Sequence, residues 1–386
     1  MKLLVLNEHD VHELLTMREC IRVMEEALAD LARGKVTNPL RSMLRADGAA
    51  GILGLMPAYR GDFGLKEICV YPANPSRGLD THLGLVILHD GETGAPKAIM
   101  NASAITAIRT AAVSAVATKL LARDDAHTLA ILGAGVQAKS HLEAIPLVRD
   151  INEVRIFSRT AEKARRVAAG FSPPIGGLKA AATHFVGSAE EAVRGADIIV
   201  TATSSKEPVV KREWLAPGTH INAVGSSVKT SRELDAETVA GAAFFVDRRE
   251  STVNESGDYL MSGVGPDHIR AEIGEILIGQ AKGRRSKDDI TIFKSLGLNF
   301  SSVRRSGAGG ERGSISENGD AAEDGHVNEA SREQIFVNAS HPRLAAVNEH
   351  HRCRWIRRSR IHSAAVPFRT EDCRNGLVDH VFFPVR

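Results

Sequence analysis

Cysteine is scarce in this 386-residue chain. The four cysteines are scattered and form no C-x-x-C pair; they are Cys20, Cys69, Cys353 and Cys373. A disulfide framework or a structural zinc site would need ordered spacings, so the sequence predicts neither, and no metal site. A reduced, cytoplasmic protein is the expectation.

A strong excess of charge is also missing, and so is a membrane signature. Lys and Arg total 49 against 47 Asp and Glu, which gives a net charge of +2. This balance gives no reason to expect nucleic acid or an anionic membrane as a partner. No apolar run is expected to reach the length of a membrane span, and the opening MKLLVLNEHD is charged too early for a signal peptide. We therefore expect a soluble protein.

One local pattern predicts a nucleotide site. Residues 128–132 are typical of a buried parallel strand, and Gly133, Gly135 and Ala138 follow with the G-x-G-x-x-A spacing of a dinucleotide-binding turn. The first glycine permits a tight turn, the second lets the backbone approach a pyrophosphate, and the alanine lets the next helix pack closely. Such glycines can also simply end a strand, so the neighbouring elements must decide.

The chain beyond this turn alternates strands and helices. Strands are predicted at 153–157, 196–203, 219–227 and 243–247, with a helix over 161–170. This alternation is typical of βαβ units, so we predict an α/β fold whose doubly wound, Rossmann-type parallel sheet carries helices on both faces. Contacts to the cofactor are expected from Thr110, Gly133, Ala134, Gly135, Val136, Gln137, Ser158, Arg159, Thr160, Thr201, Ala202, Thr203, Val224, Gly225, Ser226 and Lys294.

The end of the second strand bears on the choice of nucleotide. An NAD site usually has Asp or Glu there for the ribose 2′-hydroxyl, whereas a nearby Arg accommodates a 2′-phosphate. This chain has Ser158, Arg159 and Thr160, with no carboxylate before Glu162. The pattern favours NADP(H), with NAD(H) possible because Arg159 is also compatible with an ordinary solvated arginine.

The first 120 residues predict a separate α+β domain. A helix is expected over 17–32, ended by Gly34, then strands at 51–59, 63–72 and 83–90, and a helix over 103–121. With 386 residues, of which 43% are hydrophobic, the chain is long enough for two cores. We predict a substrate-binding and dimerisation domain over 1–120 and a nucleotide-binding domain over 121–300.

Three cations in the first domain stand in apolar or turn-rich surroundings. Arg41 follows NPL, Lys66 lies inside GLKEICV, and Arg109 lies in AITAIRTAAVSA. A buried cation needs an anion, and any one of these is compatible with pairing to a protein carboxylate or with reaching water. Three of them on a nucleotide-binding chain favour a substrate carboxylate, because arginine forks match carboxylate geometry.

Several stretches together resemble the ornithine cyclodeaminase/mu-crystallin family, over roughly residues 1–300. They include GLKEICVYPANPSRGLDTHLGLVILHDGETG, LAILGAGVQAKSHLEAI, ESGDYLMSG and TIFKSLGLNF. The resemblance implies a homodimer and hydride transfer between nicotinamide and the α-carbon of an amino acid or its imine. It also places Arg41, Lys66, Thr81 and Arg109 at the substrate, with Lys66 and Arg109 as the catalytic candidates.

One departure from the family pattern helps to distinguish the amine-oxidising members of the family from the imine reductases. Ornithine cyclodeaminases and related alanine dehydrogenases carry an aspartate two residues beyond the glycine of NAVG, where this chain has Ser227. Oxidation of an amine needs a base at this position to take up a proton, whereas reduction of an already protonated imine does not need one. We expect an NADPH-dependent reductase of cyclic ketimines such as Δ1-piperideine-2-carboxylate and Δ1-pyrroline-2-carboxylate. The alternatives are an NAD-dependent ornithine cyclodeaminase and an NADPH-binding, crystallin-like protein without turnover. Asp258 of ESGDY is a candidate substitute carboxylate, although a loop cap is the favoured interpretation.

The last part of the chain does not fit the family. Residues 301–386 contain 13 arginines and no lysine, and the segment from Ser301 is polar and glycine-rich without helical or strand periodicity. This composition predicts a disordered tail over 301–386. We also consider a shifted reading frame after Phe300, which resequencing of the gene would test.

Overall fold

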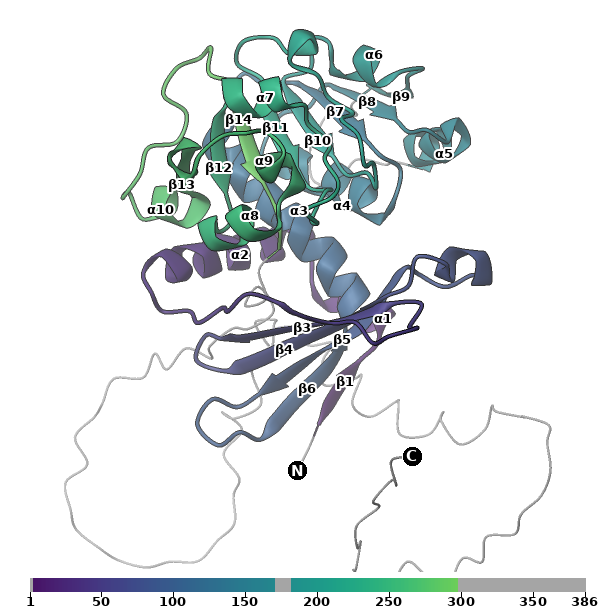
Figure 1. Ribbon diagram of the computed structural model, residues 1–386, viewed down its shortest axis with the longest axis vertical. Coiled ribbons are helices and arrows are strands. Elements are labelled where there is room, and N and C mark those ends of the chain that lie inside the picture. Colours follow the sequence, from purple (N-terminus) through teal and green to yellow (C-terminus); the bar gives the residue numbers. More distant parts are fainter. Residues whose placement is uncertain (1–2, 171–181, 298–386) are drawn as a thin grey trace, which may run out of the picture. The chain divides into compact units, whose positions relative to one another are not determined.

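The computed structural model describes residues 3–170 and 182–297, all within one compact unit (Figure 1). The predicted tail over 301–386 and the reading-frame hypothesis lie outside the described residues. The described chain forms two sheets, one from its first third and one from the remainder.

The first sheet is antiparallel except at one edge. Its order is β1-β6-β5-β4-β3-β2, and β1 pairs in parallel with β6. The three predicted strands are confirmed as β3, β4 and β5 to within one or two residues at each end. Strands β1, β2 and β6 were not predicted; the first two span only three residues and carry too little alternation to detect. The strand bounds are β1 Leu4–Leu6, β2 Ser42–Leu44, β3 Ile52–Tyr59, β4 Phe63–Val70, β5 His82–His89 and β6 Pro96–Asn101.

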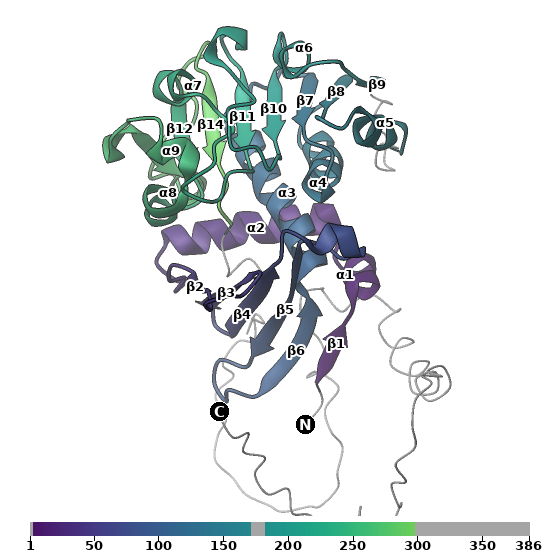
Figure 2. The ribbon, with the colours of Figure 1, turned by 45° about the vertical axis from the view of Figure 1, so that its right-hand side comes forward.

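Two long helices lie between this sheet and the second sheet (Figure 2), preceded by the short α1 (Glu8–Leu14). Helix α2 (Met17–Ala32) has the predicted bounds; the Thr16 hydroxyl caps its start, and Gly34 follows its end at a left-handed φ of +71°. Helix α3 (Ala102–Leu121) is buried nearly all round. Residues of both helices and of both sheets share one hydrophobic cluster, which includes Phe245 and Phe293. The predicted boundary at residue 120 therefore stays a prediction.

Helix α3 corrects one expectation. Among the described residues it is long and apolar enough to cross a membrane by length and composition alone, so the expectation that no run reaches this length is wrong. Its most apolar window is 83% buried inside the structure. Small residues such as Ala111 and Ala115, both 0% exposed, let neighbouring elements approach closely. In this structure α3 is a core helix.

The second sheet contains eight parallel strands in the order β13-β12-β14-β11-β10-β7-β8-β9. Its strands are β7 Thr128–Leu132, β8 Glu153–Phe157, β9 Ala182–Phe185, β10 Ile198–Thr201, β11 His220–Ala223, β12 Ala243–Val246, β13 Ile269–Glu272 and β14 Thr291–Lys294. The helices of this part are α4 Val136–Ala144, α5 Ala161–Gly170, α6 Ala189–Val193, α7 Ala236–Gly241, α8 Arg249–Glu255, α9 Gly257–Leu260 and α10 Ile273–Leu277.

Alternate residues of β7 face different helices, as a doubly wound sheet requires. Leu129 clusters with Ala138 of α4, whereas Ala130 clusters with Val239 of α7. The predicted α/β class with helices on both faces is thus confirmed. From β7 the chain runs outward through β8 and β9 and then returns to β10, so the strand order reverses between β7 and β10. Ligands of open α/β sheets bind at the carboxyl ends of the strands at such a point.

Candidate active site

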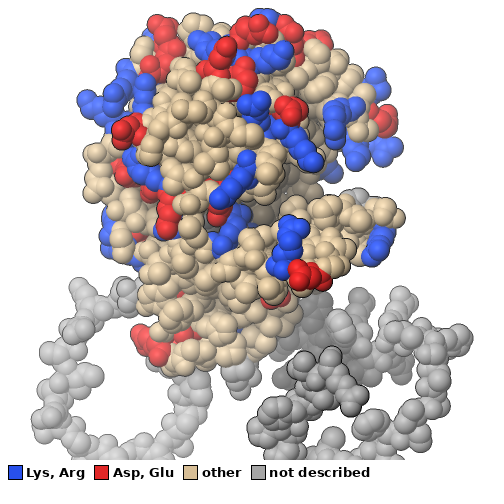
Figure 3. Space-filling view, in the orientation of Figure 1, with Lys and Arg blue, Asp and Glu red and all other residues tan. Residues whose placement is uncertain are grey.

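A cavity of about 1040 Å³ opens at this reversal point and extends to the face of the first sheet. Figure 3 shows it as a dark hollow in the surface. The ends of β7, β8, β10 and β11 contribute one wall, and strands β2 to β5 with the start of α3 contribute the other. The two halves are described below as the nucleotide half and the substrate half.

The turn after β7 has the geometry that its glycines predict. Gly133 has a φ of +126°, and a Cβ there would lie 2.4 Å from the carbonyl oxygen of Ala202, so a side chain is excluded. A Cβ on Gly135 would meet no atom within 4 Å, which leaves open space at the start of α4. No side chain caps this helix. The first N–H groups of α4 are therefore available to an anion such as a pyrophosphate.

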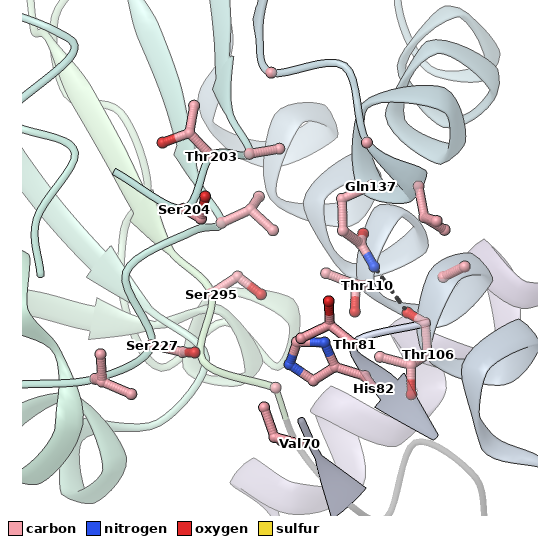
Figure 4. Close-up of a pocket in the computed structure, with 18 of the residues that line it drawn as sticks. Val70, Thr81, His82, Thr106, Thr110, Gln137, Thr203, Ser204, Ser227 and Ser295 are labelled. Atoms are coloured by element: carbon pink, nitrogen blue, oxygen red, sulfur yellow. Dashed lines mark hydrogen bonds between the residues drawn. The ribbon is translucent and has the colours of Figure 1, made fainter. Parts of the chain in front are cut away.

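Gln137 has a polar atom without a protein partner. Its amide nitrogen donates to the carbonyl oxygen of Thr106 at 3.4 Å, the dashed line in Figure 4. Its Oε1 is buried, and no hydrogen bond joins it to any described residue. A buried acceptor without a donor is costly, so this atom fits a ligand group that donates a hydrogen bond.

The end of β8 carries positive charge. Ser158, Arg159 and Thr160, for which cofactor contact is predicted, line the cavity together with Lys163 of α5. Glu162, the first carboxylate after the strand, pairs instead with Arg166 at 3.1 Å and does not line the cavity. Lys163 was not predicted, because only the helical turn of α5 brings it to the same side as Arg159.

The ends of β10 and β11 supply both lining and supporting residues. Ala202, Thr203 and Val224 line the cavity, together with residues that were not predicted: Ser204, Ser205, Val209, Ser227, Val228 and Lys229. Ala134 and Val136, in the turn after β7, line it as well. Thr201, Gly225, Ser226 and Lys294 are not among the residues that line the cavity, and their contact with the cofactor stays a prediction.

These four residues belong to a buried layer behind the cavity. Lys294, fully buried, pairs with Asp258 at 2.9 Å and donates to the carbonyl oxygen of Gly225. Glu233, also fully buried, accepts hydrogen bonds from the Thr201 hydroxyl at 2.8 Å and the Thr203 N–H at 2.6 Å. Burial raises the pKa of Glu233, and the charge of Lys294 opposes that shift. The layer fixes the backbone that lines the cavity.

Asp258 and Ser226, two residues of this layer, both hold loop backbone in place. Asp258 accepts hydrogen bonds from the N–H groups of Glu233 and Leu234, at 2.6 and 3.0 Å, so its interpretation as a loop cap is confirmed. Ser226 has a left-handed φ of +57°, and its hydroxyl donates to the carbonyl oxygen of Ser231. Both residues therefore shape the loop that presents Ser227 to the cavity (Figure 4).

The substrate half contains two buried cations that form no ion pair with a described residue. Lys66 of β4 is 6% exposed, and its Nζ lies 3.4 Å from the hydroxyl oxygen of Thr106. Arg109 of α3 is 7% exposed, and its guanidinium lies against Gly297. Neither forms an ion pair with a described residue. Burial, helped by the charges of Arg109 and Arg41, lowers the pKa of Lys66 well below its usual value.

The pKa of Arg109 is likewise lowered, to about 10, mainly by burial. Asp247 is the anion that most opposes this shift. Its Oδ2 accepts the N–H groups of Leu296 and Gly297, each at 2.8 Å, and so holds the segment that packs on Arg109. Ser295, which the sequence analysis missed, lines the cavity in the same segment (Figure 4).

Arg41 differs from the other two cations because it already has an anion. Its Nη2 lies 2.6 Å from Glu255 Oε2 and donates to the carbonyl oxygen of Leu296 at 2.9 Å. Burial raises the pKa of Glu255, and Arg41 opposes the shift. The sequence analysis singled out Asp258 in ESGDY, but the carboxylate of that motif that lines the cavity is Glu255.

Hydroxyl groups and apolar side chains complete the substrate half. The predicted residues Thr81 and Thr110 line it, together with His82, which was not predicted (Figure 4). Alternate positions of β3 and β4 present an apolar surface beside Lys66, because residues two apart on a strand face the same side. This surface consists of Ile52, Gly54, Met56, Ile68 and Val70, with Met43 of β2.

Comparison with known proteins agrees with this arrangement. A family model described as the ornithine cyclodeaminase/mu-crystallin family matches residues 1–304. Mouse (Mus musculus) ketimine reductase mu-crystallin is 40% identical over 281 residues, which cover 71% of this chain and 86% of that protein.

Two solved structures also match the chain. The first is Δ1-pyrroline-2-carboxylate reductase from Thermococcus litoralis in complex with NADH and L-proline. It is 39% identical with a TM-score of 0.73, and the match covers 77% of this chain and 93% of that one. The second is an archaeal alanine dehydrogenase dimer with bound NAD, 35% identical with a TM-score of 0.72 over 78% of this chain and 92% of that one.

Proposed function

Because the chain belongs to the ornithine cyclodeaminase/mu-crystallin family, we propose that it is an NAD(P)H-dependent reductase of amino-acid imines. Its proposed substrates are cyclic ketimines with a 2-carboxylate, Δ1-piperideine-2-carboxylate and Δ1-pyrroline-2-carboxylate, and its products are pipecolate and proline. The observation that carries the proposal is the pair of buried cations, Lys66 and Arg109, in a cavity that continues to the nucleotide turn. A substrate carboxylate would supply the anion that they lack.

The nucleotide half fits a nicotinamide dinucleotide. The open space over Gly135, the uncapped start of α4 and the unpaired Gln137 Oε1 are features that a bound dinucleotide would use. When bound, the cofactor supplies the hydride for reduction. We propose a preference for NADP(H) over NAD(H), supported by Arg159 and Lys163 at the end of β8, where no carboxylate lines the cavity.

In this proposal the two cations have different tasks. The Arg109 fork binds the carboxylate and thereby fixes the α-carbon in front of the nicotinamide site. Lys66 donates the proton that the imine nitrogen gains while the α-carbon accepts the hydride. An ammonium whose pKa is well below that of an ordinary lysine is a better proton donor near neutral pH. Thr81 and Thr110 offer hydroxyl groups to the same space.

The direction of the reaction is proposed from Ser227. This residue lines the cavity at the position where amine-oxidising relatives are expected to have a carboxylate. A hydroxyl is a poor base, so oxidation of a substrate amine is disfavoured relative to reduction of an imine.

We also propose a cytoplasmic homodimer. The face of the first sheet opposite Lys66 carries a cross-strand row of Leu44, Leu53, Cys69 and Leu83, in which Leu44 is 61% and Leu83 39% exposed. Such an apolar surface is typical of an interface. The archaeal alanine dehydrogenase that resembles this chain is a dimer. Light scattering of the purified protein tests this assignment.

The function is tested by following the oxidation of NADPH and of NADH by absorbance with each cyclic ketimine, beside an ammonia assay on L-ornithine. The proposal predicts imine-dependent oxidation that is faster with NADPH. Ammonia release from ornithine without net change of nicotinamide would replace it by ornithine cyclodeaminase. Tight NADPH binding with no turnover of any imine would leave a binding protein instead.

A further inference from the structure

The substrate half has three cations but only one of them is neutralised by the protein. Arg41 and Glu255 pair at 2.6 Å, and their side chains are only 18% and 17% exposed. Lys66 and Arg109 have no such partner among the described residues. Glu255 already pairs with Arg41, and in the proposed function Lys66 serves the imine nitrogen, so Arg109 is the cation left to bind a ligand carboxylate.

We propose that Glu255 is a specificity-determining residue which restricts the site to imines and amino acids with a single carboxylate. This inference rests on the proposed function and deepens it. A ligand with a second carboxylate would bring that group to the cation next to Lys66 and Arg109, which is Arg41. There it would meet the Glu255 carboxylate at close range, and repulsion between like charges is strong in a partly buried site.

The rest of the substrate half offers little alternative to a second carboxylate. The wall formed by β3 and β4 beside Lys66 is apolar, with Met56 and Ile68 buried. Lys229, the other cation that acts on Glu255, also lines the cavity, but it is exposed on the loop after β11, where solvent screens its charge. Releasing Arg41 from Glu255 is therefore the change that would admit a second carboxylate.

Binding of product-type amino acids separates this role from catalysis. We would measure dissociation constants of L-proline and L-pipecolate, with one carboxylate, and of L-aspartate and L-glutamate, with two. The full chain would be saturated with NADP⁺ and studied by titration calorimetry. The variants are Glu255→Gln, which keeps the shape but removes the charge, and Glu255→Asp, which keeps the charge. Glu250→Gln is the matched control: it lies on the same helix, is exposed and pairs with Arg248 outside the cavity.

In Glu255→Gln, binding of the dicarboxylates relative to proline should improve by about tenfold or more, the factor that corresponds to about 1.4 kcal/mol. Glu255→Asp and Glu250→Gln should keep the wild-type ratio. The double variant Arg41→Met/Glu255→Gln should lose the gain, because Arg41 supplies it.

An unchanged ratio in folded Glu255→Gln, or weaker binding of both ligand classes, would overturn the inference and leave Glu255 as an anchor for Arg41. A gain that survives in the double variant would overturn it as well. If the wild type binds proline but reduces no cyclic ketimine, the proposed function fails while these binding ratios still decide the role of Glu255.

Discussion

The two halves of the cavity satisfy their buried polar groups in different ways. Behind the nucleotide half, Lys294 pairs with Asp258, and Glu233 accepts hydrogen bonds from Thr201 and Thr203. In the substrate half, Lys66 and Arg109 are buried and form no ion pair with a described residue. An unpaired buried charge is unfavourable. The buried charges behind the nucleotide half are paired within the protein, whereas we propose that a ligand carboxylate balances those of the substrate half.

The largest effect is expected from removing the buried ion pair behind the nucleotide half. Lys294→Met would leave Asp258 as a buried, unpaired charge, so we predict a loss of about 3–5 kcal/mol in the free energy of unfolding. Urea titration followed by circular dichroism measures it. Lys287→Met, at an exposed position, is the control. A loss below about 1 kcal/mol, the range of exposed pairs, would show that the pair contributes no more than a surface salt bridge.

Acid should also weaken the part of the protein that contains the second sheet. Burial lowers the pKa of His141 to about 4 and that of His220 to about 3, both from 6.5. The unfolded chain takes up these protons below pH 6.5 while the folded protein does not. Stability is therefore full above pH 6.5 and falls by about 1.4 kcal/mol per pH unit for each histidine down to its folded pKa.

Unfolding titrations at pH 7 and pH 5 test this dependence. His220→Gln should reduce the difference between the two pH values, whereas His184→Gln, at an exposed position, should leave it unchanged. Equal pH dependence in the wild type and in His220→Gln would contradict the assignment.

The two glycines of the nucleotide turn should separate stability from binding. Gly133→Ala forces a side chain into a left-handed backbone and against Ala202, so we predict a loss of about 1–2 kcal/mol or more in stability. Gly135→Ala meets no protein atom within 4 Å and should leave stability nearly unchanged but weaken binding of the dinucleotide. Thermal unfolding and fluorescence titration with NADPH compare the two variants. Equal behaviour in both measurements would show that the glycines do not have distinct tasks.

The smallest effect is expected at the end of β8. Arg159→Ala should reduce the preference for NADPH over NADH by about tenfold, the loss of one exposed phosphate contact. Arg166→Ala, on the solvent side of α5 in a pair with Glu162, is the matched control. An unchanged ratio of kcat/KM for the two cofactors in Arg159→Ala would remove this residue from nucleotide selection.

The sequence predicted the nucleotide half better than the substrate half, for a physical reason. The strand before Gly133 and the helix after it follow from local periodicity and glycine spacing; the bounds of the strand and the existence of the helix are confirmed. The sequence showed three cations in apolar or turn-rich surroundings, Arg41, Lys66 and Arg109. It did not show which residues they contact. Glu255 and Asp258 lie three residues apart in one motif, and only the fold decides which of them faces the cavity.

The same limit explains the predicted cofactor residues that lie behind the cavity. Thr201 ends β10 and Lys294 ends β14, so both stand at the ligand edge of the sheet. Their side chains point to the buried layer rather than to the cavity, as their bonds to Glu233 and Asp258 show. Side-chain direction at a strand end depends on the pleat and the loop that follows, which the motif alone does not specify.

In the proposed function, the buried Arg109 guanidinium forms an ion pair with the carboxylate of the substrate. The most direct measurement is kcat/KM of the wild type and Arg109→Met with Δ1-piperideine-2-carboxylate and with Δ1-piperideine, the same ring without the carboxylate. The account predicts a loss of about 100-fold or more with the carboxylate and only a few-fold loss without it. An equal loss with both rings would contradict it, because Arg109 would then support the site without binding the carboxylate.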